Sequence, residues 1–147
     1  MSVQLRRKAE LFYKALEDIW SAEQLQKGSP NNAIWLCTQA AEKTMKGYLR
    51  CLNKEFGYDH NLEVLQEETN KTVKLSDETN KAILFLNAFG STLRYKVMKT
   101  DPTPDDAKVV ISRTKLILDE FSRIPDITSY INEAKEIHTK ILKTVNV

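Results

Sequence analysis

The chain is poor in the residues that mark several common classes of protein. Its 147 residues include four glycines, four prolines, two cysteines and two histidines. So little glycine and proline excludes collagen-like and low-complexity chains. No apolar run approaches the roughly 20 residues that a membrane-spanning helix needs, and none follows the first residues as it would in a signal peptide. We therefore expect a soluble cytoplasmic protein that has no membrane partner.

The cysteines and histidines are also poorly placed for chemistry. Cys37 and Cys51 lie fourteen residues apart in one predicted helix, which separates them by about 20 Å, beyond the reach of a disulfide. Neither His60 nor His138 follows a glutamate at the three-residue spacing of a bundle di-iron site. Glycine loops that bind phosphate and the elbow motif of serine hydrolases are absent. We expect no metal, no cofactor and no catalytic residue.

The charges of the chain nearly cancel. Lysine and arginine number 22 against 20 for aspartate and glutamate, a formal net charge of +2. This balance does not favour a protein coated by nucleic acid, but it leaves room for a local basic patch. Hydrophobic residues make up 41% and charged residues 29%, as in folded rather than disordered chains. The length predicts one domain spanning residues 1–147.

Apolar residues recur at spacings of three and four along almost the whole chain, as they do on one face of an α-helix. The predicted helices span about residues 5–27, 31–53, 60–70, 76–89, 103–121 and 126–145. No segment alternates with the period of a strand, and no linker is long enough to separate domains. The sequence thus predicts an all-α, antiparallel up-and-down bundle of five or six helices. Its core would cover about residues 5–121, with an extra C-terminal helix at 126–145.

Start and stop signals mark the boundaries of these helices. Gly28 is expected to end the first helix, Gly57 to end the second or lie just past its end, and Pro125 to begin the last. Residues that commonly cap a helix N-terminus stand at or just before the start of the second to fifth predicted helices: Ser29, Asp59, Ser76 and Thr103.

The predicted helix at 31–53 has an apolar side and, in its middle, residues with unusually small side chains. The side predicted to be buried consists of Ala33, Leu36, Cys37, Ala40, Thr44, Gly47, Tyr48 and Cys51. The small residues in its middle are Ala40, Ala41, Thr44 and Gly47. Small side chains let a partner helix approach closely, so this patch favours an interaction surface for another protein.

A stripe of polar residues runs along the same helix. Gln39, Lys43, Lys46 and Arg50 follow one another at spacings of four, three and four, well away from the predicted apolar side. One interpretation is a surface that binds phosphate groups. The other is an ordinary solvated helix face.

A second group of cations follows the fourth helix. Arg94, Tyr95 and Lys96 stand next to one another, and Lys99 comes shortly after. Arginine can bind a phosphate in a bidentate manner, and a tyrosine ring can stack on a base. Alternatively, Tyr95 packs at a helix junction and Arg94 pairs with a neighbouring acid.

At this point the chain resembles a known family. Residues 31–49 read NNAIWLCTQAAEKTMKGYL, and the pattern Q-A-A-E-K-x-x-K resembles the second helix of HEPN domains (higher eukaryotes and prokaryotes nucleotide-binding). Three further features match in the same order: His60, Leu62 and Leu65 in H-x-L-x-x-L, the pair Arg94-Tyr95, and Thr103, Asp106 and Ala107 at the start of the long helix. The resemblance covers about residues 5–121, and the helix after Pro125 looks like an addition.

What the resemblance implies depends on the subgroup. Many members are similar to toxin ribonucleases with an R-x(4–6)-H motif, whose arginine and histidine meet across a dimer. Here Lys99, Thr100 and Asp101 stand where that histidine would follow Arg94. Without an imidazole there is no evident general acid or base for attack by the RNA 2′-OH. The resemblance then implies a non-catalytic member, dimeric and often encoded beside a nucleotidyltransferase.

Three functions follow from these observations. The first is a non-catalytic nucleotide- or RNA-binding module. The second is a homodimeric protein-interaction module that works with a nucleotidyltransferase-type partner, as in a toxin–antitoxin pair. The third is an atypical ribonuclease that uses Arg94 with Tyr95. For the first, the expected phosphate-binding residues are Lys43, Lys46, Arg94, Tyr95 and Lys96, with Gln39, Arg50 and His60 as secondary candidates.

Overall fold

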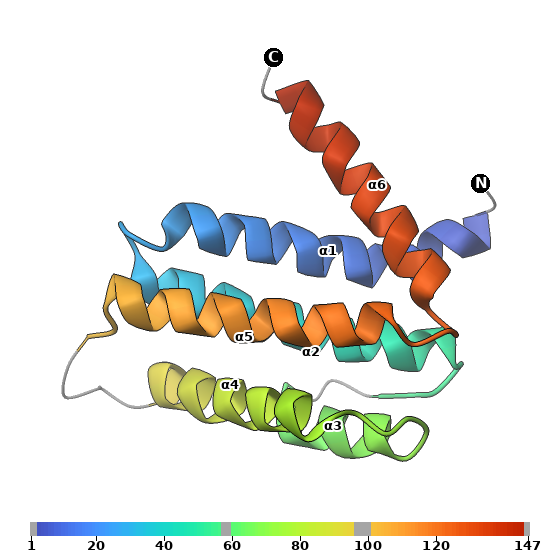
Figure 1. Ribbon diagram of the computed structural model, residues 1–147, viewed down its shortest axis with the longest axis horizontal. Helices are drawn as coiled ribbons and strands as arrows, with labels where there is room; N and C mark the ends of the chain where they lie inside the picture. Colours follow the sequence, from blue (N-terminus) through green and yellow to red (C-terminus); the bar gives the residue numbers. More distant parts are fainter. Residues whose placement is uncertain (1–2, 57–59, 96–100, 146–147) are drawn as a thin grey trace.

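The computed structural model describes residues 3–56, 60–95 and 101–145; side chains are described from residue 7 and, in the second range, as far as residue 89. Six α-helices account for most of these residues, and none of them forms a strand. The helices (Figure 1) are α1 (Val3–Leu25), α2 (Pro30–Cys51), α3 (Leu62–Asn70), α4 (Asp77–Tyr95), α5 (Pro104–Ser122) and α6 (Thr128–Val145). The predicted all-α bundle is confirmed.

Helix α2 lies at the centre of this bundle. It packs against α1, α3, α4 and α5, and its contact with α1 is the most extensive between any two of the described helices. Helices α1 and α2 run in opposite directions, as do α3 and α4, whereas α3 runs in the same direction as α2 (Figure 1). Helix α4 packs beside α5. Helix α6 contacts α1 near its start and then leaves the bundle at an angle.

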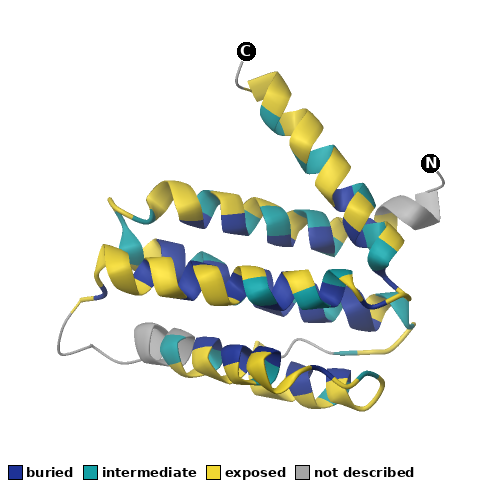
Figure 2. Ribbon diagram, in the orientation of Figure 1, coloured by how far each residue is buried: buried dark blue, intermediate teal, exposed yellow. Residues whose placement is uncertain are grey.

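The central position of α2 explains why its burial differs from the prediction. Besides the expected positions, Ile34, Met45 and Leu49 are buried, because neighbours surround α2 on several sides rather than one. Leu36 and Cys51, predicted in the core, are half-buried. Figure 2 shows the buried residues concentrated along the middle layer of the bundle.

The small residues in the middle of α2 face other helices of the same chain. Ala40, Ala41 and Thr44 are at most 1% exposed. A Cβ atom added at Gly47 would lie 2.8 Å from Cε1 of Phe12 on α1. The prediction that this patch presents a surface to another protein was wrong, because α1 already uses the close approach that the patch allows.

The helix boundaries follow the predicted caps in part. Ser76 Oγ accepts from the Thr79 N–H at 3.1 Å, and Thr103 forms a full capping box with Asp106; both predictions are confirmed. Ser29 occupies the N-cap of α2 but its side chain makes no capping bond, because its hydroxyl accepts from the Asn32 side chain instead.

Three other boundaries differ from the prediction. Asn61 caps α3 by accepting from the Glu63 N–H, whereas the predicted cap, Asp59, lies outside the described residues. Helix α2 ends at Cys51, two residues before the predicted end at Asn53, because Asn53 adopts a left-handed conformation with φ of 57°. Helix α6 begins at Thr128, three residues after Pro125, since the intervening residues form a turn.

None of the described helices is both long enough and apolar enough to cross a lipid bilayer.

Substituting Gly47 by alanine tests the contact between α1 and α2. Alanine favours a helix over glycine by about 1 kcal/mol, but its Cβ would collide with the fully buried Phe12 ring, and overpacking of this kind costs about 1–3 kcal/mol. We expect Gly47→Ala to lower the free energy of unfolding in urea. Gly28→Ala is the matched control, because nothing lies within 4 Å of the added Cβ there. A Gly47→Ala protein as stable as the control would contradict the close approach.

The two cysteines give a prediction about pH. Both are free thiols, and burial raises the pKa of each from 9.0 to about 11. Because the reactive species is the thiolate, both thiols should react with an aromatic disulfide reagent at pH 8 far more slowly in the native protein than in urea.

The same shift affects stability. The unfolded chain loses the two thiol protons near pH 9.0, before the folded chain does near 11, so the free energy of unfolding should fall as the pH rises between these values. The fall should be smaller for Cys37→Ala. Equal reaction rates in the native and unfolded states would refute the burial of Cys37 and the partial burial of Cys51.

Candidate functional site

The polar stripe on α2 is engaged in ion pairs. Lys43 Nζ lies 2.6 Å from Asp18 Oδ2 on α1, and its side chain is 26% exposed. Arg50, at the end of α2, lies 4.0 Å from a carboxylate oxygen of Glu10. Gln39 is half-buried. The stripe is therefore not a free solvated surface, because α1 brings carboxylates against it.

The Lys43–Asp18 pair carries a desolvation cost. Burial raises the pKa of Asp18 above its ordinary value, although the Lys43 ammonium acts to lower it. Burial thus outweighs the attraction, which is the usual balance when two charges leave water together. The pair fixes how α1 and α2 align, and Lys43 would have to break it to bind a phosphate.

A second cluster centres on Glu42. Its carboxylate, 8% exposed, accepts from Lys46 Nζ at 3.3 Å and lies 3.0 Å from Nδ1 of His60. Lys46 also lies over the ring of Phe56, 5.6 Å from its centre. His60 joins α2 to the start of α3 through this contact. The cluster therefore pairs one buried acid with two of the predicted phosphate ligands.

The other predicted ligands lie at the end of α4. Arg94 and Tyr95 are its last two residues, and their side chains lie outside the described part of the structure, as do Lys96 and Lys99 entirely. Figure 1 shows that α4 ends at the end of the bundle where α2 begins, whereas Lys43 and Lys46 lie in the second half of α2. The last residues of α4 and these two lysines of α2 thus lie at different levels along the bundle.

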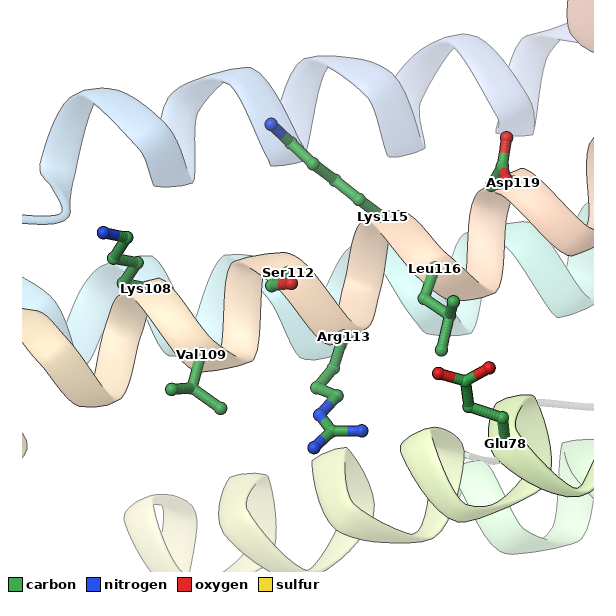
Figure 3. Close-up of a pocket in the computed structure, with 8 residues that line it drawn as sticks. All are labelled: Glu78, Lys108, Val109, Ser112, Arg113, Lys115, Leu116 and Asp119. Atoms are coloured by element: carbon green, nitrogen blue, oxygen red, sulfur yellow. The ribbon is translucent and has the colours of Figure 1, made fainter.

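Sequence reasoning missed a groove along α4 and α5. It has a volume of about 820 Å³ (Figure 3), and the residues that line it are Glu78, Lys108, Val109, Ser112, Arg113, Lys115, Leu116 and Asp119. At the Glu78 end, the Glu120 carboxylate accepts from the Ser76 N–H at 3.1 and 3.2 Å, which holds the start of α4 against the end of α5.

Three cations, Lys108, Arg113 and Lys115, line this groove. Lys115 lies 3.2 Å from Glu23 of α1. Among the described residues, no carboxylate lies within ion-pairing distance of Lys108 or Arg113. Arg113 points toward α4, and Lys108 points away from it (Figure 3). Lys108, Ser112 and Lys115 are spaced four and three residues apart, a signal that could have been noticed, but nearby acids made it look like ordinary helix surface.

The Glu42 cluster predicts a charge-dependent loss of stability. Glu42→Gln keeps the shape but leaves the Lys46 ammonium, 12% exposed, without its counter-charge. A hydrogen bond to a charged group contributes about 1.5–3 kcal/mol, so the free energy of unfolding in urea should fall by about that amount. Glu10→Gln, a carboxylate that is 48% exposed, should cost less than about 1 kcal/mol.

A double variant isolates this effect. Because removing both partners of a buried pair is often nearly neutral, Lys46→Met should recover part of the stability lost in Glu42→Gln. If Glu42→Gln and Glu10→Gln cost the same, the buried carboxylate does not have the role assigned to it.

Comparison with known proteins and families shows which family this chain belongs to. Neither a curated protein nor a solved structure shows significant similarity to the chain. A family model described as the HEPN domain matches residues 5–124, which include α2 with its Glu42 cluster and the α4–α5 groove, and exclude α6. The chain therefore belongs to the HEPN domain family.

Proposed function

We propose that this protein binds a nucleotide or RNA through phosphate groups and performs no catalysis. Its membership of the HEPN family makes it a nucleotide- or RNA-related module. The observation that carries the proposal is the α4–α5 groove, where Lys108 and Arg113 have no carboxylate partner among the described residues.

The groove has the dimensions and chemistry of a phosphate-binding surface. Its volume, about 820 Å³, lies within the about 300–1,000 Å³ typical of ligand sites. Arg113, which points toward α4, offers a fork of N–H donors that matches two phosphate oxygens, and Ser112 offers a hydroxyl. Lys108 points to the other side of α5 and adds a compact charge there (Figure 3). A cation without a counter-ion favours an anionic ligand, because the ligand supplies the missing opposite charge.

The cations of α2 are less suited to this task. Lys43 and Lys46 already have carboxylates at 2.6 and 3.3 Å, so a phosphate would have to displace an acid from each of them. The centre of the proposed site therefore moves from α2 to α5. Arg94 and Tyr95 remain candidates, because α4 ends at the end of the bundle where α5 begins (Figure 1).

The histidines support the non-catalytic part of the proposal. His60 contacts Glu42, and the His138 ring on α6 packs edge-on against Tyr13 at 6.1 Å. Neither lines the groove. A ribonuclease needs a general acid or base beside the scissile phosphate. The described lining of the groove has no histidine for this role and holds the carboxylates of Glu78 and Asp119 beside its cations.

The test is a titration of the protein with ATP, GTP, CTP, UTP and a short single-stranded RNA, followed by calorimetry or fluorescence anisotropy. A charge-assisted hydrogen bond contributes about 1.5–3 kcal/mol, so Arg113→Ala should weaken binding at least tenfold, and Arg94→Ala should do the same. Both variants should melt at nearly the wild-type temperature. Lys140→Ala, which removes an exposed cation on α6, should leave affinity unchanged.

The outcome also decides between the two main functions. If neither the nucleotides nor the RNA bind to the wild-type protein, the phosphate proposal fails. The alternative, a protein-interaction module that works with a nucleotidyltransferase-type partner, then takes its place. Binding that Arg113→Ala and Lys140→Ala weaken equally would show a non-specific charge effect and would contradict the assignment of the groove.

A further inference from the structure

Residues of α1, α5 and α6 line a hollow at the place where α6 diverges from the bundle (Figure 1). Its volume is about 270 Å³, and its apolar walls are Leu16, Ile19 and Trp20 of α1 and Leu118 of α5. Tryptophan is largely buried in most proteins, yet Trp20 is 37% exposed. Part of the indole is therefore open to a molecule that enters this feature, which we call the Trp20 hollow.

Most of the charged residues around the Trp20 hollow are paired. Glu23 and Lys115 form an ion pair at 3.2 Å, and Asp119 pairs with Arg123 at 2.9 Å. Among the lysine, aspartate and glutamate residues of its described lining, only Lys135 has no ion-pair partner within the described structure. Apolar walls and paired charges suit an uncharged aromatic ring better than a phosphate, because most of the nearby cations already have an opposite charge beside them.

The Trp20 hollow adjoins the α4–α5 groove. Lys115 and Asp119 line both of them, so the two spaces meet over α5. Figure 3 shows Arg113 pointing toward α4 and Lys115 pointing toward α1. The groove alone has the volume of a site for a whole small ligand, about 820 Å³. The hollow is therefore space for a further unit of a longer ligand.

We propose that the ligand of the α4–α5 groove is a single-stranded RNA rather than a mononucleotide, and that one of its unpaired bases stacks on Trp20 in the adjoining hollow. This inference rests on the proposed function, because the groove must hold a phosphate of the strand. The cations of the groove and the ring of the hollow then have separate tasks. Arg113 binds the backbone, and Trp20 binds a base.

A single strand suits this arrangement better than a duplex. The bases of a single strand can turn away from the backbone and stack on aromatic side chains, whereas the bases of a double helix are stacked on one another. Binding sites for single strands commonly combine cations along a groove with an aromatic ring. Such stacking accepts every base, because each base has a flat face, so we expect little preference for sequence.

The two tryptophans of the chain allow a direct test by fluorescence. Trp35 of α2 is the matched control, because it is 48% exposed but lines neither the groove nor the hollow. Trp35→Phe leaves Trp20 as the only indole, and Trp20→Phe leaves Trp35. Titration with a single-stranded oligoadenylate should quench the fluorescence of the Trp35→Phe protein and leave that of the Trp20→Phe protein unchanged.

Affinities measured by calorimetry test the same contact. The wild-type protein should bind the oligoadenylate at least about tenfold more tightly than adenosine monophosphate. Trp20→Leu removes the ring and should weaken oligoadenylate binding at least about fivefold, which is the effect of losing one stacked base. Trp20→Phe keeps a ring and should weaken it less, and Trp35→Leu should leave it unchanged. If circular dichroism shows that Trp20→Leu does not fold, the fluorescence of Trp35→Phe decides.

The contrary outcomes separate this proposal from the proposed function. Equal affinity of the wild-type protein for adenosine monophosphate and for the oligoadenylate would overturn the proposal. So would an oligoadenylate that binds without quenching Trp20, or that quenches Trp20 and Trp35 equally. In each of these cases Arg113→Ala would still weaken binding, and the proposed function would stand. If neither ligand binds to the wild-type protein, the proposed function and this proposal fail together.

Discussion

The close approach of α1 to α2 is the contact on which the rest of the structure depends. Gly47 allows it, because its missing side chain makes room for the fully buried ring of Phe12. With α1 this close, Lys43 reaches Asp18, and the Cys51 thiol reaches the backbone oxygen of Lys8. The remaining sides of α2 are then free to pack against α3, α4 and α5. A bulkier residue at position 47 would move α1 and shift these contacts together.

The central position of α2 also determines which lysines need a carboxylate partner. A lysine on a surface helix is solvated, but Lys43 and Lys46 lie where neighbouring helices remove much of their water. Each therefore has a carboxylate partner, and Glu42 serves both Lys46 and His60. Burying unpaired charges would cost several kcal/mol. Helix α5 has one side facing solvent, so its cations need no such partner, which is why an anion-binding surface fits there better.

Local patterns in the sequence predicted the helices, the capping roles of Ser76 and Thr103 and the family, because these depend on residues a few positions apart. Two of the ion pairs of α2, His60–Glu42 and Lys43–Asp18, join residues 18 and 25 positions apart, and periodicity does not indicate which charged residues meet at such separations. The groove needs both α4 and α5 in place before Glu78 and Arg113 share a surface. The small patch on α2 was correctly identified as a close-packing site but assigned to the wrong partner, since a stripe of small residues does not reveal whether the helix beside it belongs to the same chain.

The contact between Glu120 and the Ser76 N–H makes the α4–α5 groove mechanically asymmetric. A carboxylate at the start of a helix is also favoured by the helix dipole, so this end of the pair is doubly restrained. Any separation of α4 from α5 would therefore be smallest at this end of the pair and largest at the other end. The gap would widen toward the start of α5, where Lys108 lies. A bulky anionic ligand would thus enter from the end where Lys108 lies and meet the carboxylate of Glu78 at the restrained end.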